Sequence, residues 1–501
     1  MKNLLLESLR NHARQQPQKV ALSALEQNLT WQDLASAVDE LTGHFVVCNR
    51  LGLLMKNSPA WVIADLAALD AELCNIPLPT FFSDEQLIHA LTDASIDHVL
   101  TDQAERIMDL VDVIEAESLE IAGIPCQLLK VRSTIHISDT DSVCKVTYTS
   151  GTTGSPKGVQ LMRAQIETVA QSLAEAARGR PDDRALVLLP LSTLLENIGS
   201  VYVPLLKGAQ ILVPSPEALG IFGSSHIVPE TLAKTLNLCH PTTLIVPPQL
   251  LKLLVMLARQ QLLPGSIRFI AVGGAPVGQA LLDQAEALGL PVFQGYGLSE
   301  ACSVVAVNTP AANRKGSVGR PLPHQQVRIT DKGEICILGQ TFSGYLNEPK
   351  RNINTELMTG DLGYLDDDGY LYVTGRINNR IITSYGRNVS PEWLESELQS
   401  HPAITQAAVL GSDKPYLIAV LVPSRHRPVH EQITVLEKAI GSVNQALPDY
   451  AQIQEFLIAE EPFTLKNGLC TANGRPRHDL IESRYFTEIT KLYAEGKRTL
   501  F

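Results

Sequence analysis

Between Leu51 and about Phe293, short apolar runs alternate with segments in which apolar residues recur at helical spacing. The intervening segments 230–237 and 248–260 have the helical period. An apolar run of this kind predicts a buried strand, and strands that alternate with helices predict a sheet covered by helices. We therefore expect an α/β body. The clearest predicted strands are Leu186–Leu189, Ile211–Val213, Thr243–Val246 and Ile267–Val272.

After about Gly316 the pattern changes to strands separated by Gly and Asp, and the chain closes with a mixture of helix and strand signals. Asp366–Gly369 reads as a hairpin turn without chemistry. The expected fold class is thus α/β, with a large N-terminal domain of helix-covered sheets, a β-rich subdomain and a small mobile α+β C-terminal domain. The expected spans are 1–376 for the large domain, with the β-rich part at about 316–376, then a hinge at 377–380 and the small domain at 381–501.

The composition of the 501 residues is that of a globular protein, with 45% hydrophobic and 19% charged residues. A formal net charge of -12 disfavours binding to nucleic acid over a broad surface. The eight cysteines are scattered without metal-ligand spacing, so we expect reduced buried thiols. No secretory signal or spanning stretch is recognisable, which predicts a cytoplasmic protein and leaves peripheral contact with a membrane open.

A polar, glycine-rich stretch follows the strand-like residues Lys145–Tyr148. Glycine lets the backbone approach an anion, hydroxyl groups donate to phosphate oxygens, and Lys157 adds a mobile positive charge. The stretch is not a Walker motif, because it contains no Gly–Lys followed by Ser or Thr. By composition alone it could equally be a surface loop. The candidate phosphate-binding residues are Thr149, Ser150, Gly151, Thr152, Thr153, Gly154 and Lys157.

This string resembles the signature of the adenylate-forming (AMP-binding) superfamily, which includes acyl-CoA synthetases, firefly luciferase and the adenylation domains of nonribosomal peptide synthetases. The resemblance extends over essentially the full chain and is closest in appearance to long-chain fatty acyl-CoA synthetases. Further signatures follow in the family's order, namely Gly273–Pro276, Tyr296–Glu300, Gly316–Pro321, Thr359–Gly363 and Gly375–Arg376.

The resemblance implies a nucleotide site. It places adenine on the ring of Tyr296, the ribose hydroxyls on Asp361 with help from Arg376, and a phosphate on Ser299. It implies that Glu300 and Thr152 hold Mg²⁺. Residues whose backbone would line the adenine and acyl pockets are Gly273, Gly274, Ala275, Pro276, Gly295 and Gly297.

The segment Leu189–Glu196 resembles the part of fatty acyl-CoA synthetases that flanks the acyl group. Glu196 matches a carboxylate there and is expected to assist with Mg²⁺, whereas Thr193 stands where many relatives have His. The segment lacks the Asp with which amino-acid-activating relatives hold an ammonium group. An apolar carboxylic acid is therefore favoured.

Two positions depart from the family pattern. Arg475 aligns with the catalytic C-terminal lysine, and Asn378 occupies the hinge where relatives have Asp or Lys. Arginine keeps the positive charge but not the compact geometry of an ammonium group. We expect Arg475 either to stabilise the same transition state or to slow the first half-reaction. Gly386 belongs to the loop expected to line the thiol tunnel.

The implied reaction joins a carboxylate to ATP, with catalytic residues Lys157, Glu300, Arg475 and Glu196. Acyl-AMP and pyrophosphate would form first, and CoA would then accept the acyl group. A medium- or long-chain fatty acid is the expected substrate. Transfer to an acyl carrier protein is an alternative, and a nucleotide- or acyl-binding protein with weakened catalysis is another.

Overall fold

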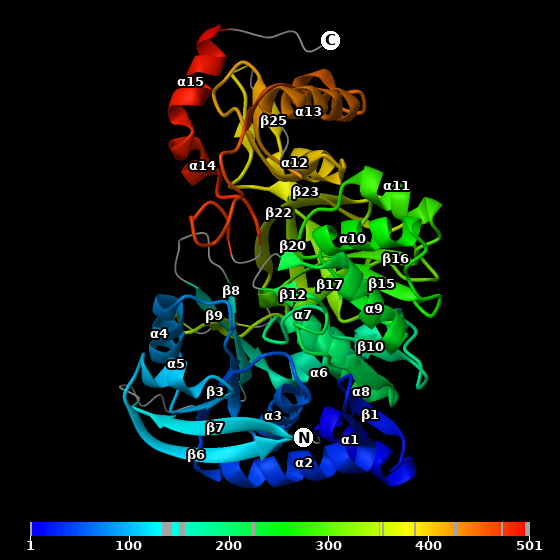
Figure 1. Ribbon diagram of the computed structural model, residues 1–501, viewed down its shortest axis with the longest axis vertical. Coiled ribbons are helices and arrows are strands. Elements are labelled where there is room, and N and C mark those ends of the chain that lie inside the picture. Colours follow the sequence, from blue (N-terminus) through cyan, green and yellow to red (C-terminus); the bar gives the residue numbers. More distant parts are fainter. Residues whose placement is uncertain are drawn as a thin grey trace.

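A computed structural model describes residues 3–132, 143–149, 156–222, 226–349, 351–352, 355–384, 387–424, 428–471 and 474–495. The chain forms a large lower part and a smaller upper part that contains the C-terminal helices (Figure 1). Within the described residues, no helix has both the length and the apolar character needed to cross a membrane. All eight cysteines are buried and free, as the sequence predicted.

The first sheet of the large domain has eight strands, in the order β21-β9-β8-β4-β3-β5-β7-β6. Its centre is parallel, because β3 pairs in parallel with both β4 and β5. The strands are β3 (Arg50–Leu54), β4 (Cys74–Pro77), β5 (His98–Thr101), β6 (Val113–Ile121), β7 (Ile124–Val131), β8 (Val143–Thr149), β9 (Lys157–Met162) and β21 (Gly344–Tyr345).

The second sheet has nine strands, in the order β18-β17-β16-β15-β14-β10-β11-β1-β2. The six strands from β16 to β1 pair in parallel. The strands are β1 (Val20–Ser23), β2 (Asn28–Thr30), β10 (Arg184–Leu186), β11 (Gln210–Leu212), β14 (Thr243–Val246), β15 (Phe269–Val272), β16 (Val292–Leu298), β17 (Ser303–Val307) and β18 (Arg320–Pro321), and a separate short pair is β12 (Ile221–Phe222) with β13 (His226–Ile227).

Helices of the large domain cover and separate these sheets, and α3 is buried along almost its whole length. Local sequence fixes several helix starts. A capping box joins Thr30 to Asp33 at α2, and Ser83 to Gln86 at α4. The helices are α1 (Leu4–Gln15), α2 (Trp31–His44), α3 (Pro59–Asp70), α4 (Asp84–Asp93), α5 (Ala104–Met108), α6 (Arg163–Ala176), α7 (Leu194–Glu196), α8 (Val203–Lys207), α9 (Pro229–Cys239), α10 (Pro248–Arg259) and α11 (Gln279–Ala287), with a π-helix at Asn197–Tyr202 and 3₁₀ turns at Phe45–Val47 and Ser299–Ala301.

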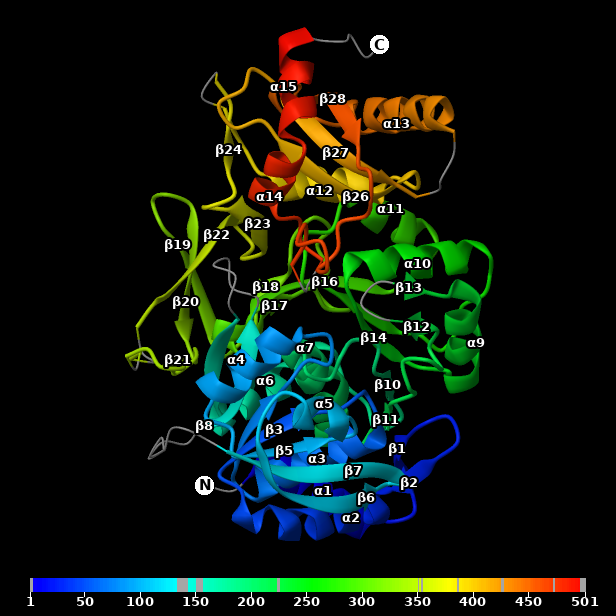
Figure 2. The ribbon, with the colours of Figure 1, turned by 60° about the vertical axis from the view of Figure 1, so that its left-hand side comes forward.

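A four-stranded antiparallel sheet leads from the large domain toward the small one (Figure 2). It consists of β19 (Gln325–Ile329), β20 (Glu334–Gly339), β22 (Leu357–Leu365) and β23 (Leu371–Arg376). The remaining C-terminal elements are β24 (Ile381–Ile382), β25 (Asn388–Val389), α12 (Pro391–Ser400), β26 (Ile404–Leu410), β27 (Leu417–Pro423), α13 (Val429–Asn444), a 3₁₀ turn at Asp449–Ala451, β28 (Ile453–Ile458), α14 (His478–Arg484) and α15 (Phe486–Glu495).

These elements confirm the predicted α/β class and most of the predicted strands and helices. One predicted strand is displaced, because β10 spans Arg184–Leu186 and overlaps the predicted Leu186–Leu189 only at Leu186. The N–H of Leu188 donates to Glu196 Oε1 at 2.9 Å instead of to a neighbouring strand. A buried carboxyl group therefore takes the donor that a longer strand would have used. The predicted turn at Asp366–Gly369 is confirmed between β22 and β23.

A buried ion pair joins a strand of the eight-stranded sheet to the helices packed against it. Lys145 on β8 and Asp65 on α3 are almost fully enclosed, and their Nζ and Oδ1 atoms lie 2.7 Å apart. The ammonium also donates to Asn197 Oδ1 at 2.5 Å and to the Tyr202 hydroxyl at 2.8 Å, both on the π-helix. Asp65 accepts from Asn75, Asn197 and Tyr202. All three donors of the ammonium group are thus used.

The small domain has a partly buried ion pair of its own. His478 at the start of α14 lies with Nε2 2.6 Å from Oε1 of Glu395 on α12, and Val409 N donates to the same oxygen. Burial by itself lowers the pKa of His478, but the Glu395 carboxylate outweighs burial and the net pKa lies above the ordinary 6.5. The pair attaches the C-terminal helices to α12.

Replacing Lys145 tests the buried network. Lys145→Met leaves the Asp65 carboxylate enclosed without its cation, so the free energy of unfolding should fall by about 3–5 kcal/mol in urea denaturation. The matched control is Lys56→Met, which breaks an exposed pair with Glu217 and should cost less than about 1 kcal/mol. Equal losses in the two variants would contradict the structural role of the network.

The His478–Glu395 pair makes stability depend on pH. Because the folded-state pKa of His478 is raised, the pair contributes its full stability below the unfolded value of about 6.5 and loses it as pH rises through the folded value. The difference in unfolding free energy between wild type and His478→Gln should therefore shrink as pH increases from about 5 to about 9. A difference independent of pH would show that folding leaves the pKa of His478 unshifted.

Candidate active site

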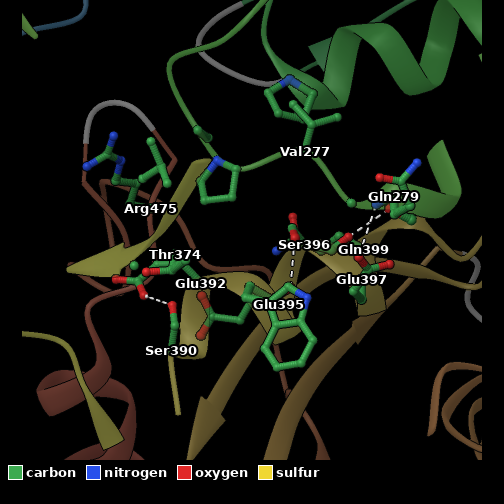
Figure 3. Close-up of a pocket in the computed structure, with 18 of the residues that line it drawn as sticks. Val277, Gln279, Thr374, Ser390, Glu392, Glu395, Ser396, Glu397, Gln399 and Arg475 are labelled. Carbon is green, nitrogen blue, oxygen red and sulfur yellow. Dashed lines mark hydrogen bonds between the residues drawn. The ribbon is translucent and has the colours of Figure 1, made fainter. Parts of the chain in front are cut away.

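A cavity of about 990 Å³ lies between the large and small domains (Figure 3). Its walls come from the ends of β15, β16, β22 and β23 in the large domain and from α12 and the segment before α14 in the small domain. Among the predicted residues that line it are Gly274, Ala275, Pro276, Gly295, Tyr296, Gly297, Asp361, Arg376 and Arg475. The fold therefore brings one large group of the predicted nucleotide residues together.

The segment Gly273–Pro276 connects β15 to the start of α11. Gly274 has a φ of +80°, a left-handed conformation that favours glycine, and its carbonyl faces the small domain. Parallel strands ending at one edge of a sheet typically form a ligand-binding crevice there. The segment lies at such an edge, between the ends of β15 and β16.

Asp361 organises the large-domain wall of the cavity. It is paired with Arg376 across β22 and β23, so that Arg376 Nε donates to Asp361 Oδ1 at 2.7 Å. The Tyr296 hydroxyl donates to Asp361 Oδ2, also at 2.7 Å. Burial first, and then the Asp361 charge, raises the pKa of Tyr296, so the phenol stays protonated. Each carboxylate oxygen can accept a further hydrogen bond, which leaves room for hydroxyl donors of a ligand.

Arg475 reaches the same cavity from the small domain. Its Nη2 donates to the carbonyl oxygen of Gly274 at 2.9 Å, although the two residues are 201 positions apart. Figure 3 shows Arg475 on the wall opposite the Gln279–Glu397 contact. A permanent cation therefore stands at the segment that was predicted to contact the nucleotide.

A second group forms around Tyr345, on β21. Its hydroxyl donates to Glu300 Oε1 at 2.8 Å, and Lys157 Nζ lies 4.8 Å from the centre of its ring. Lys157 also contacts Glu348 Oε1 at 2.9 Å. Sequence reasoning missed Tyr345 and Glu348, because only the pairing of β21 with β9 brings them to Lys157.

The predicted phosphate loop lies only partly within the described residues. Thr149 ends β8 and is paired with Lys157 at the start of β9, so the two residues that flank the predicted loop lie side by side. Ser150, Gly151, Thr152, Thr153 and Gly154 lie outside the described residues, as does Gly386. Ser299 begins the 3₁₀ turn that carries Glu300.

Glu300 suits a magnesium–nucleotide site, since Mg²⁺ commonly takes one or two carboxylates together with substrate phosphates. In the part of the chain that the structure describes, no group of three or more His, Cys, Asp or Glu residues gathers to hold a metal by itself. Glu196 lies apart from the cavity and is fully enclosed. Burial raises its pKa to about 8, so at neutral pH it is mostly protonated. Its Oε1 accepts the N–H of Leu188, which follows β10.

Two models of known protein families together match almost the whole chain. Residues 9–346 match the model described as AMP-binding enzyme, and residues 378–497 match that described as AMP-binding enzyme C-terminal domain. The chain is 29% identical to a 2-succinylbenzoate–CoA ligase of Bacillus subtilis, over 84% of this chain and 88% of the relative. It is 27% identical to a long-chain-fatty-acid–CoA ligase of Mycobacterium tuberculosis, over 89% and 88%.

Solved structures agree with this relationship. The o-succinylbenzoate CoA synthetase from Bacillus subtilis in complex with its acyl-adenylate intermediate has a TM-score of 0.75 and 26% identity, covering 96% of this chain and 98% of that one. The same enzyme has been solved with ATP and a magnesium ion. An anthranilate CoA ligase with 19% identity and a TM-score of 0.78 shares the fold over 96% of both chains. The chain belongs to the AMP-binding enzyme family.

Proposed function

We propose that this enzyme activates a carboxylic acid with ATP and then transfers the acyl group to CoA. The observation that carries the proposal is the position of Arg475, which contacts Gly274 from the small domain beside the Asp361–Tyr296–Arg376 group. A cation from the small domain thus lies beside a carboxylate of the large domain that is suited to accept hydrogen bonds from ribose hydroxyls. Relatives that ligate acids to CoA, matched over most of their length, support the same reaction.

In the first half-reaction a carboxylate oxygen attacks the α-phosphorus of ATP, an acyl–phosphate bond forms, and the bond to pyrophosphate breaks. We propose that Asp361 and Arg376 orient the ribose, while Tyr296 supports adenine. Lys157 and Arg475 offset negative charge on the phosphates from opposite domains. Mg²⁺ bound with ATP supplies further charge neutralisation, and Glu300 is the carboxylate that we propose for it.

In the second half-reaction a thiol attacks the acyl carbon, and AMP leaves with the electrons of the anhydride bond. We propose that the small domain rotates about residues 377–380, which connect the two domains. This rotation would move Arg475 out of the cavity and let the thiol reach the acyl carbon. Conformational exchange of this kind lets one site serve two chemical steps.

For the acid, we propose a medium- or long-chain fatty acid. The similarity to the long-chain-fatty-acid ligase and the absence of an Asp partner for an ammonium group in 189–196 support an apolar acid. The similarity to 2-succinylbenzoate ligases favours an aromatic acid as the second candidate. Leu191, Leu194 and Ile198 are buried in the main core, so the structure gives the predicted alkyl tunnel no separate support.

An acid panel separates these proposals. The purified protein is incubated with ATP, Mg²⁺ and octanoate, palmitate or 2-succinylbenzoate, with and without CoA, while pyrophosphate, AMP and thioester are measured. We expect CoA-dependent thioester with a fatty acid. Thioester with 2-succinylbenzoate alone would select the aromatic acid. Adenylate without thioester would point to a carrier-protein thiol, and no pyrophosphate with any acid would favour a binding protein.

The role of Arg475 is tested by removing its charge. Arg475→Ala should lower the rate of pyrophosphate release by about 100-fold, because a preorganised cation at developing charge is lost. Formation of thioester from chemically prepared acyl-adenylate should be retained. Arg477→Ala is the matched control, since Arg477 does not line the cavity. Unchanged pyrophosphate release in Arg475→Ala would rule out the catalytic role.

A further inference from the structure

The small domain rests on the large domain through helix α12, which lies beside α11 (Figure 1). This contact surface lines the same cavity as Arg475, and Figure 3 places Gln279 and Glu397 on the side of the cavity away from Arg475. Two charged side chains and one glycine define it. We call Lys252, Glu397 and Gly278 the docking contact.

Lys252 on α10 of the large domain binds the end of α12. Its Nζ donates to the backbone carbonyls of Gln399 at 2.7 Å, His401 at 2.9 Å and Ile404 at 2.9 Å. Gln399 lies in the last turn of α12, where carbonyls have no partner within the helix and the helix dipole places partial negative charge, whereas His401 follows the helix and Ile404 begins β26. Burial lowers the pKa of Lys252 to about 8, so at neutral pH the amine keeps its proton and has three donors for these three acceptors.

Glu397 makes the reciprocal contact. It lies on α12 of the small domain, and its Oε1 accepts from the backbone N–H of Gln279 at 3.0 Å. Gln279 is the first residue of α11 in the large domain, where N–H groups lack partners and the dipole is positive. Each domain therefore supplies the charge that completes a helix end of the other.

Gly278 allows the helices to approach this closely. A Cβ atom at this position would lie 2.2 Å from Ser400 Oγ and 2.6 Å from the backbone oxygen of Ser396, both on α12. The second distance involves backbone, so a side chain at 278 would push α12 away. The docking contact thus combines three features from three different elements on the two sides of the domain boundary.

We infer that Lys252, Glu397 and Gly278 are positioning residues for adenylate formation, which hold the small domain so that Arg475 stays at Gly274. The inference rests on the proposed function for its chemical consequence. Rotation of the small domain for thioester formation must break all four hydrogen bonds of the docking contact. The contact therefore sets the balance between the two half-reactions without touching either substrate.

The test compares the two half-reactions in Lys252→Met. Pyrophosphate release follows the docked fraction of molecules, and thioester formation from prepared acyl-adenylate follows the undocked fraction. Because the ratio of these rates follows the docking equilibrium, it should fall by about tenfold or more when the three hydrogen bonds are lost. Lys234→Met, at an exposed lysine on neighbouring α9, should leave the ratio unchanged.

Hydrogen exchange supplies a readout that needs no substrate. In Lys252→Met the peptide covering 277–287, which includes the Gln279 amide, should exchange faster by a similar factor, whereas peptides of α9 should not change. Gly278→Ala disrupts the same contact without altering charge and should act in the same direction. It also keeps the test available if Lys252→Met folds poorly.

An unchanged ratio together with unchanged exchange at 277–287 in both variants would overturn the inference, and so would an equal fall in both half-reactions. Wild-type protein that releases no pyrophosphate with any acid would instead refute the proposed function. In that case the exchange experiment still decides whether the docking contact holds the domains together.

Discussion

The enclosed Lys145–Asp65 pair is the interaction on which the arrangement of the large domain depends. An ammonium group without water must find acceptors for all its donors, and here the three acceptors come from α3 and the π-helix. Lys145 lies on β8, whose end at Thr149 begins the predicted phosphate loop. The pair therefore fixes the strand that leads to the loop relative to the helices packed between the two sheets.

The active site is then completed from separate parts of the chain. Strand register places Arg376 opposite Asp361, and the pairing of β21 with β9 brings Tyr345 to Lys157. Docking of the small domain adds Arg475. The candidate site is thus assembled by strand register, strand pairing and domain docking, and the rotation that we propose would remove Arg475 while Asp361, Tyr296 and Arg376 stay in place.

Much of the fold was predictable from local pattern. Thr243–Val246 forms the predicted strand, and the predicted helix over 248–260 forms as α10. The strand predicted at Leu186–Leu189 lies too far along the chain, since β10 ends at Leu186, and its apolar letters carry no information about the Glu196 carboxyl group that takes the Leu188 N–H. Likewise, the sequence placed Glu196 among the expected catalytic residues. Only the packing shows that its side chain is fully enclosed.

The sequence by itself determined the family and the α/β class and predicted a set of nucleotide residues, because these follow from residue types at short and ordered spacing. Only the tertiary structure decided which of them meet. Arg475 and Gly274 are 201 positions apart, and Lys252 and the end of α12 about 150, so no local pattern relates them. Their contacts arise because charged side chains of one domain form hydrogen bonds with unpaired backbone groups of the other. These backbone groups come within reach only once both domains have folded.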